Sequence, residues 1–302
     1  ILQFEKAIKI DPKNAEFYFN LGSANCSRGH FQKAIPQLEK AVSLNSKYVK
    51  AHNQLGRACI AANKKNVAIK HFEKVLEIQP NHGEAQHFLA VSNGLTPDSA
   101  PRSYVESFFE EFSDTFESSL LGRLAYKAPT QMAKLITENK RNKKLGSILD
   151  LGCGTGLMGL ALRQNCSNIE GVDLAKRMLA EAKRKTVYDK LHHSDITKYL
   201  EVELLDFDLF IATDVFIYIG NLSKIFRLIK TRNKRSGRLA FSTEHIKNKD
   251  FFLEDTGRYS HSKQYIKNLC KQFDYKMDHF EIVNLRKEKG RFLQGGLYLL
   301  SF

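Results

Sequence analysis

The chain has 302 residues, of which 42% are hydrophobic and 26% are charged. This balance is typical of globular proteins and excludes an intrinsically disordered chain, and the length predicts about two domains. No stretch approaches the roughly 18 consecutive apolar residues that a membrane-spanning helix requires, so no membrane span is expected. The five cysteines lie far apart and form no Cys-x-x-Cys pair, which argues against a disulfide framework or a bound metal and favours a cytoplasmic location.

The net charge of +14 is distributed over the whole chain and is not gathered in a tail. Such an excess favours acidic partners in general, although a solvated basic surface is the simpler interpretation. The basic runs lack the interleaved aromatic residues that stack on bases, so nucleic acid is not expected as a partner. These runs cover residues 140–144, 183–185 and 230–238.

A period of 34 residues runs through the first third of the chain. Phe4, Leu38 and Phe72 stand 34 residues apart, as do the Leu-Gly pairs at 21–22 and 55–56. Each unit is predicted to form two amphipathic helices, with the glycines where two helices approach closely. The pattern resembles tetratricopeptide repeats over residues 1–94. Because the first and last copies are incomplete, further repeats are expected before the start of this sequence.

The function of the repeats stays open at this stage. Arrays of the tetratricopeptide family offer a concave groove for a peptide or a partner domain, which makes a protein partner one expectation. A short array is equally consistent with a module for dimerisation or packing.

Residues 95–101 contain two prolines and small polar residues, which predicts a linker. An aromatic stretch follows, in which spacings of three to four residues place most rings on one helical face. We interpret its phenylalanines as a core face, and we expect any lid over a ligand to use Tyr104, Tyr126 and Lys127, which can form hydrogen bonds. The aromatic residues of the stretch are Tyr104, Phe108, Phe109, Phe112 and Phe116.

From Gly146 onward, short apolar segments alternate with helical ones. Strands are expected near residues 147–151, 169–172, 190–192, 207–212 and 238–242. Five alternating β-α units predict a parallel sheet with right-handed crossovers. Two closing strands, near residues 280–286 and 297–302, are predicted to form an antiparallel hairpin and to make the sheet mixed.

One strand-to-helix turn carries the strongest chemical signal. It has glycines at positions 152, 154 and 156, which let the backbone turn tightly and lie close against a ligand. Their Gly-x-Gly-x-Gly spacing differs from the Gly-x-Gly-x-x-Gly of dinucleotide-binding proteins. Asp150 precedes the first glycine, where a carboxylate does not help to bind phosphate but could receive the cationic amino-acid end of a ligand.

Acidic residues also end the next two expected strands. Asp173 lies 17 residues beyond Gly156, where it could accept hydrogen bonds from two ribose hydroxyls. Asp195 ends the third strand and could accept a hydrogen bond from an adenine amino group. A glycine loop alone is a weak signal, but the three elements in this order, each at a strand end, are specific.

This combination resembles class I S-adenosylmethionine-dependent methyltransferases over roughly residues 104–302. Together with the repeats, the segments 214–220 and 257–262 are similar to a bacterial group of predicted repeat-containing methyltransferases, related to enzymes of the ubiquinone and biotin pathways. The resemblance implies S-adenosylmethionine as the cofactor, and it implies these cofactor-binding residues: Asp150, Gly152, Cys153, Gly154, Gly156, Asp173, Leu174, Asp195, Ile196 and Asp214.

The expected fold class follows from the pattern and the resemblance together. It is α/β, a seven-stranded, mostly parallel Rossmann-like sheet with an antiparallel C-terminal hairpin, preceded by an α-helical tetratricopeptide-repeat domain. The expected domains cover residues 1–94 and 102–302, the second including the lid helices.

Candidates for the acceptor end follow the fourth and fifth strands, because ligands bind at the carboxyl edge of open α/β sheets. Asp214 and His245 are the catalytic candidates, although a structural role is the more expected one for histidines here. The amino-group motif of DNA-base and glutamine methylases is absent, since Val-Phe follows Asp214. The candidates for contact with the substrate or a lid are Tyr218, Arg258, Tyr259 and His261.

The expected activity is methyl transfer to a small-molecule, carrier-linked or protein acceptor. The enzyme would mainly position donor and acceptor and exclude water. The alternative is a scaffold or assembly factor that binds the cofactor without methylating, or that uses the site for another reaction. Accumulation of S-adenosylhomocysteine would discriminate between them.

Overall fold

The computed structural model describes residues 1–123, 126–139, 144–288 and 290–302. The chain divides into two units. One comprises Ile1–Pro97 together with Leu253–Gly257, and the other comprises Asp98–Phe252 and Arg258–Phe302.

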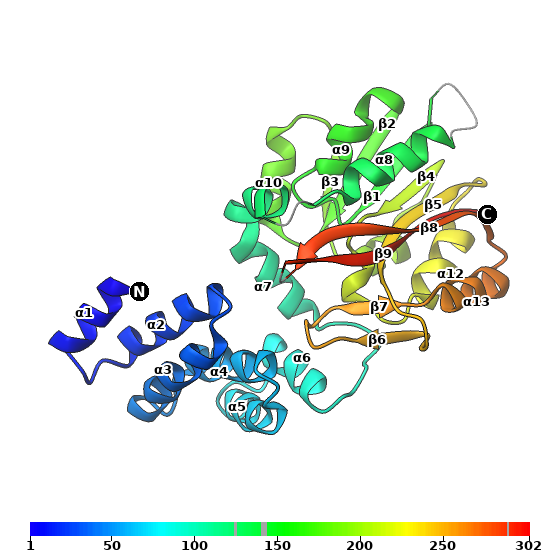
Figure 1. Cartoon of the computed structure of the whole chain (residues 1–302). Helices are drawn as coiled ribbons and strands as arrows, with labels where there is room; N and C mark the ends of the chain where they lie inside the picture. The colour runs from blue at the N-terminus through cyan, green and yellow to red at the C-terminus, as the bar shows by residue number, and fades with distance from the viewer. Residues whose placement is uncertain (124–125, 140–143, 289) are drawn as a thin grey trace. The chain divides into compact units, whose positions relative to one another are not determined.

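The first unit is helical (Figure 1). Consecutive helices pack against each other, and the two glycines of the repeat lie where they do so. A Cβ atom on Gly22 would lie 2.6 Å from Leu38, and one on Gly56 would lie 2.6 Å from the ring of Phe72. The 34-residue period therefore corresponds to one close helix contact in each repeat. The helices are α1 (Leu2–Ile10), α2 (Ala15–Ser27), α3 (Phe31–Leu44), α4 (Val49–Ala61), α5 (Lys65–Ile78) and α6 (Gly83–Ser92).

The second unit is built on a single mixed sheet, in the order β3-β2-β1-β4-β5-β7-β6, with β9 pairing antiparallel to both β5 and β8. The pairs β1–β2, β1–β4, β2–β3 and β4–β5 are parallel. In the described residues the strands are β1 (Ser147–Leu151), β2 (Asn168–Asp173), β3 (Lys190–His193), β4 (Leu209–Ala212), β5 (Arg238–His245), β6 (Phe251–Leu253), β7 (Tyr259–His261), β8 (Lys276–Glu288) and β9 (Arg291–Ser301).

The predicted fold class is confirmed, with two additions. The sheet contains the short strands β6 and β7, and the hairpin strands β8 and β9 are longer than expected. Strands of three residues carry too little alternation to be recognised in a sequence. Register shifts interrupt β8 between Met277 and His279 and between Asn284 and Arg286, so its side-chain alternation is broken.

Helices cover both faces of the sheet, and each face has its own core. Ile148 of β1 packs with α8 (Ala128–Glu138) and α9 (Leu157–Leu162). Leu149, the next residue, packs on the opposite face. That face is covered by α11 (Ile196–Val202), α12 (Ser223–Arg232) and α13 (Lys263–Phe273). α10 (Lys176–Arg184) connects β2 to β3.

Two segments precede the sheet in the chain. The predicted linker is bound along its second half, because Ala100 donates to the carbonyl of Tyr218 and the Asp98 carbonyl accepts from Gly220. The aromatic stretch forms α7 (Arg102–Phe112), a 3-10 turn (Ser113–Thr115) and a π-helical turn (Ser118–Arg123).

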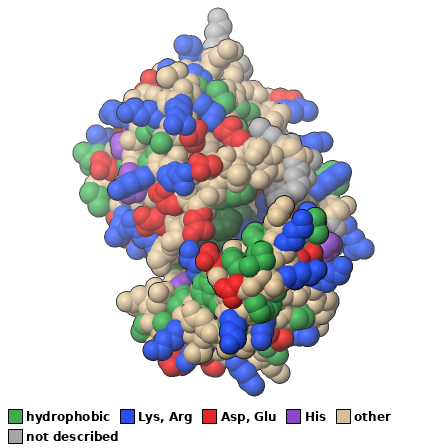
Figure 2. Space-filling model, turned by 90° about the vertical axis from the view of Figure 1, so that its left-hand side faces the viewer, with side chains coloured by type: hydrophobic (Ala, Val, Ile, Leu, Met, Phe, Trp, Pro, Cys, Tyr) green, Lys and Arg blue, Asp and Glu red, His purple; other side chains and the backbone are tan. Residues whose placement is uncertain are grey.

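Basic side chains are dispersed among acidic and uncharged ones on the face shown in Figure 2. Several residues of the basic runs pair with carboxylates of the chain itself, including Lys185 with Glu117 and Arg235 with Asp206. Most of the run at 140–144 lies outside the described residues. No described helix is long and apolar enough to cross a membrane.

The close contact between Gly56 and Phe72 can be tested by the sign of the change in unfolding free energy in a Gly56→Ala variant. Helix propensity alone predicts that Gly56→Ala stabilises α4, whereas the Phe72 contact predicts a loss of about 1–3 kcal/mol. Urea unfolding followed by circular dichroism measures the difference. A higher unfolding midpoint for the variant would contradict the packing described above.

Candidate active site

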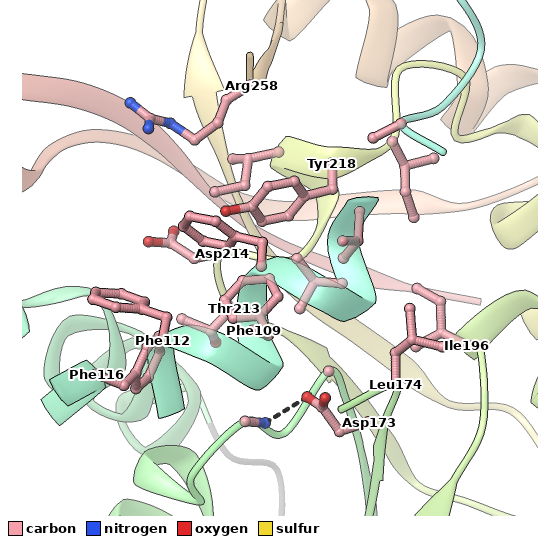
Figure 3. Close-up of a pocket in the computed structure, with 18 of the residues that line it drawn as sticks. Phe109, Phe112, Phe116, Asp173, Leu174, Ile196, Thr213, Asp214, Tyr218 and Arg258 are labelled. Carbon is pink, nitrogen blue, oxygen red and sulfur yellow. Dashed lines mark hydrogen bonds between the residues drawn. The ribbon is translucent and has the colours of Figure 1, made fainter. Parts of the chain in front are cut away.

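A pocket of about 440 Å³ lies at the carboxyl edge of the parallel strands, and the described residues that line it all belong to the second unit. The turns after β1, β2, β3 and β4 contribute to its wall, and the aromatic stretch covers it. Figure 3 shows Asp173, Leu174 and Ile196 toward one end of the pocket and Asp214, Tyr218 and Arg258 toward the other. This is the place at which parallel α/β sheets bind ligands.

The glycine loop is attached to the end of β2. The backbone of Gly154 donates a hydrogen bond of 2.8 Å to Oδ2 of Asp173, drawn dashed in Figure 3. Oδ1 of the same carboxylate accepts from the backbone of Ala175 at 2.8 Å. Gly154 has φ +54°, a conformation that residues with a Cβ rarely adopt. Burial raises the pKa of Asp173 in spite of these hydrogen bonds.

The end of β3 supplies a second carboxylate to the same end of the pocket. Oδ1 of Asp195 caps α11 by accepting from Thr197 at 2.9 Å and from Lys198 at 3.0 Å. Leu174 and Ile196 add apolar walls. Gly152, Gly154, Asp173, Leu174, Asp195 and Ile196 all line the pocket, so the structure brings these predicted residues together.

Three predicted cofactor residues lie behind the pocket wall. Asp150 is 1% exposed, and its Oδ2 accepts a 2.7 Å hydrogen bond from Tyr188, so its placement does not support the expected contact with an amino-acid end. The Cys153 thiol packs 2.8 Å from where a Cβ of Gly171 would be. Gly156 begins α9 with φ +93°. These residues shape the loop, because the alternation of β1 turns Asp150 toward the α8–α9 face.

At the opposite end, Asp214 follows β4 with φ +57°. This conformation is uncommon for a residue with a Cβ, and it is held by side chains from three other segments. Ser242 donates to Oδ1 at 2.9 Å, Arg286 donates to Oδ2 at 3.0 Å, and Tyr126 is also hydrogen-bonded to this carboxylate. Asp214 is thereby fixed in place, with both carboxylate oxygens engaged.

Arg286 of β8 is a site residue that our sequence analysis does not identify. It donates through Nη1 to Asp214, through Nη2 to Glu244 and through Nε to Glu288 at 3.3 Å. Arg258 donates to Glu244 at 2.5 Å and also to Glu288. These charges meet because β5 pairs with β4, β7 and β9, and β9 pairs with β8, and no spacing in the sequence signals it.

The two arginines and three acids form a charged cluster, which comprises Asp214, Glu244, Arg258, Arg286 and Glu288. Burial opposes the charge of Arg286, but the nearby carboxylates outweigh it and raise its pKa. Burial raises the pKa of Glu244 despite both arginines. The cluster is therefore mutually stabilised, as buried charges must be.

The aromatic stretch corrects our expectation about the lid. Phe108, Phe109, Phe112 and Phe116 line the pocket and do not form a plain core face. The ring of Phe109 meets that of Tyr218 edge-on at 5.4 Å. Of the three expected lid residues, Tyr126 lines the pocket, whereas Tyr104 and Lys127 do not. The distinction depends on what α7 faces, which its amphipathic pattern does not reveal.

Three other candidates also lie outside the pocket lining. His261 is buried, its Nε2 lies 2.9 Å from the carbonyl oxygen of Ile219, and burial lowers its pKa to about 4. Tyr259 is fully buried. The pKa of His245 is lowered by burial and by two nearby lysines. The structure thus gives His261 and Tyr259 packing roles and does not bring His245 to the site.

Metal ligation finds no support in the part of the chain that the structure describes, where no group of three or more His, Cys, Asp or Glu residues could hold an ion. The pocket offers instead a set of groups suited to an organic ligand. Carboxylates at two strand ends, exposed backbone of the glycine loop and apolar side chains between them fit a nucleoside, and the volume leaves room beyond it.

The buried carboxyl group of Asp150 predicts a pH effect on stability. Burial raises its pKa from 3.8 to about 7, so the folded protein holds the proton more tightly than the unfolded one. The stabilisation is complete below about pH 4 and is lost as the pH rises toward 7.

Asp150→Asn should therefore reduce the loss of stability between pH 5 and pH 8, by up to about 2.6 kcal/mol. Urea unfolding at both pH values measures this. Asp173 contributes a slope of the same sign, so the slope should become shallower without vanishing. Equal losses in the wild type and the variant would show that Asp150 is ionised in the folded protein.

Glu110 of α7 provides a test of how the aromatic stretch is held. Its carboxylate accepts from the backbone amides of Lys176 at 2.5 Å and Arg177 at 3.3 Å, and so caps the start of α10. Glu110→Ala should cost about 1 kcal/mol and raise amide exchange in α7 about fivefold. Hydrogen exchange measures this, with the exposed neighbour variant Glu111→Ala as control. Equal protection in both variants would contradict the role of the cap.

Comparison with known proteins agrees with this site. A family model described as a methyltransferase domain matches residues 142–295, just over half of the chain. Two tetratricopeptide-repeat models match residues 3–35 and 27–91. A curated Streptomyces fradiae enzyme, dTDP-3-amino-3,6-dideoxy-alpha-D-glucopyranose N,N-dimethyltransferase, is 31% identical over 78 residues. These residues are 26% of this chain and 30% of that enzyme, so the match spans under a third of the relative.

Solved structures share the fold at low identity. A Leishmania major S-adenosylmethionine-dependent methyltransferase is 16% identical with a TM-score of 0.55, covering 71% of this chain and 90% of its own. Magnesium protoporphyrin IX methyltransferase from Synechocystis PCC 6803, solved with its methyl donor, is 15% identical with a TM-score of 0.51 and coverage of 68% and 99%. The [4+2]-cyclase SpnF is 14% identical with a TM-score of 0.55 and coverage of 68% and 97%.

Reaction class and fold thus agree with the glycine loop, the two strand-end acids and the pocket they line. The family model covers the glycine loop and the strands that form the pocket wall. The chain belongs to the family that this model describes, the methyltransferase domains, and carries tetratricopeptide repeats before that domain.

Proposed function

We propose that the chain methylates a small-molecule, carrier-linked or protein acceptor bound at the Asp214 end of the pocket. The observation that carries this proposal is the single cavity that joins the glycine loop and Asp173 to the charged cluster. A donor held at the first end would present its reactive group toward the second. The acceptor of the curated relative, an amino sugar by its name, belongs to the first of the three classes.

The donor site in this proposal comprises the residues that line one end of the pocket. Asp173 would accept hydrogen bonds from ribose hydroxyls, and Asp195 from an adenine amino group, with Leu174 and Ile196 on either side of the base. Gly152 and Gly154 would contact the donor through their backbone. When bound, S-adenosylmethionine supplies a methyl group that its sulfonium already makes electrophilic.

In this proposal, the residues at the acceptor end orient the acceptor and exclude water, and proton transfer is not their main role. Both oxygens of Asp214 are engaged, which makes it a residue that orients the site and a poor general base. Phe109, Phe112 and Phe116 cover the pocket and exclude water from it. Tyr126 and Tyr218 place hydroxyl groups at the acceptor end, where they can orient a polar acceptor.

The repeats are proposed to act as an interaction or dimerisation module. Tetratricopeptide repeats suggest binding of a protein. In this array, Asn53 and Arg57 of α4 both donate to Glu84, at 2.6 and 2.8 Å. Part of the polar surface of α4 is therefore committed inside the array, and recognition would use its remaining side chains.

The donor site is tested by calorimetry with S-adenosylmethionine and S-adenosylhomocysteine. Asp173→Ala removes the ribose contact and the partner of the Gly154 amide, so affinity should fall at least about tenfold. The control is Asp274→Asn, because Asp274 is exposed at the end of α13 and asparagine tolerates its φ of +56°. Undiminished binding by folded Asp173→Ala would refute the assignment.

A role without methyl transfer is the alternative, because a solved structure with this fold is named a cyclase. Turnover distinguishes the two. Accumulation of S-adenosylhomocysteine when the protein is incubated with S-adenosylmethionine and cell extract, and not with the Asp173→Ala variant, would support methylation. Tight donor binding with no S-adenosylhomocysteine in any extract would favour the alternative.

A further inference from the structure

We infer that the acceptor is an amine, received at the pocket end formed by the charged cluster. This inference rests on the proposed function and names the acceptor class of the same site. It is carried by the way in which the cluster distributes its charges between the protein and the pocket.

The arginines of the cluster are already engaged by acidic side chains of the protein. Arg286 uses all three of its guanidinium nitrogens on Asp214, Glu244 and Glu288. Arg258 donates to two of the same carboxylates. Two arginines in a pocket would ordinarily suggest an anionic substrate. Here both arginines donate their hydrogen bonds to carboxylates of the protein, so they are poorly placed to bind an anionic substrate as well.

The charge balance of the cluster points the same way. Three carboxylates face two guanidinium groups, which leaves one negative charge in excess. A carboxylate acceptor would add a second uncompensated negative charge to a largely buried site, which is costly. A protonated amine would remove the excess and would gain charge-assisted hydrogen bonds that an alcohol cannot match.

Glu288 is the group that meets the amine. It lines the pocket, and its side chain is 29% exposed, compared with 4% for Glu244 and 15% for Asp214. Both arginines donate to Oε1 of Glu288. Among the described residues no donor contacts Oε2, so this oxygen is the one offered to a ligand.

The chemistry of such an acceptor is balanced within the site. A bound ammonium group, R–NH₃⁺, transfers one proton to the carboxylate of Glu288 and becomes R–NH₂. Its lone pair then forms the new N–C bond to the methyl carbon while the C–S bond breaks and leaves its electron pair on sulfur. The product is R–NH₂⁺–CH₃ with S-adenosylhomocysteine, and the proton on Glu288 leaves to water.

The experiment compares three probes that differ only in their polar group: benzylamine, benzyl alcohol and benzoate. The phenyl ring suits the rings of Phe109, Phe112 and Phe116, so the polar group decides the difference in binding. Affinities are measured by titration calorimetry or saturation-transfer NMR on the full chain saturated with S-adenosylhomocysteine. The variants are Glu288→Gln and, as a matched control on the same strand, the exposed Glu281→Gln.

Benzylamine is expected to bind at least about tenfold more tightly than benzyl alcohol, and benzoate more weakly than either. Glu288→Gln should lose about tenfold in affinity for benzylamine and keep its affinity for benzyl alcohol and S-adenosylhomocysteine, whereas Glu281→Gln should match the wild type.

Tighter binding of benzoate, or unchanged benzylamine affinity in Glu288→Gln, would overturn the amine inference while leaving the proposed function intact. A wild-type protein that fails to bind S-adenosylhomocysteine would overturn both. The calorimetric titration with S-adenosylhomocysteine separates the two failures.

Discussion

The hydrogen bond between the Gly154 amide and the Asp173 carboxylate connects the two strand ends on which the pocket depends. It forms because β1 and β2 run parallel and end at the same edge, so the loop after one strand meets the acid that ends the next. The loop can reach that acid only with a left-handed backbone at its glycines. The other pocket walls are arranged around this connection, with Asp195 one strand farther out and Asp214 on the opposite side of β1.

The second constraint on the site is electrostatic. Asp214 has a backbone conformation that a residue with a Cβ seldom adopts, and side chains from β5, β8 and the segment before α8 hold it there. Buried charges of both signs remain favourable only when they contact each other, which ties the hairpin strand β8 to the end of β4. The hairpin therefore belongs to the site as well as to the fold, because its Arg286 pairs with acids at this end of the pocket.

Site residues that follow a recognisable strand could be predicted from the sequence, whereas contacts between residues far apart in the chain could not. The glycine loop, Asp173 and Asp195 could be assigned because each follows an apolar strand, and the sheet rule brings such ends together. The contact of Asp150 with an amino-acid end stays a prediction, and its neighbours in the sequence do not reveal the hydrogen bond that its carboxylate accepts from Tyr188. The phenylalanines of α7 were assigned to a core because an apolar helix face has the same pattern whether it meets a core or a cavity.

The sequence by itself determined the repeats, the parallel sheet, and the glycine loop and acids at the ends of its strands. These features depend on periodicity and on residues close together in the chain, and such patterns can be recognised without knowledge of tertiary contacts. Only the tertiary structure decided which end of the pocket carries charges of both signs, which aromatic rings line it, and that Arg286 and Glu288 belong to it. The position of Arg286 and Glu288 depends on the pairing of β9 with both β5 and β8, which joins residues more than 40 positions apart along the chain. The position of the rings depends on what α7 faces.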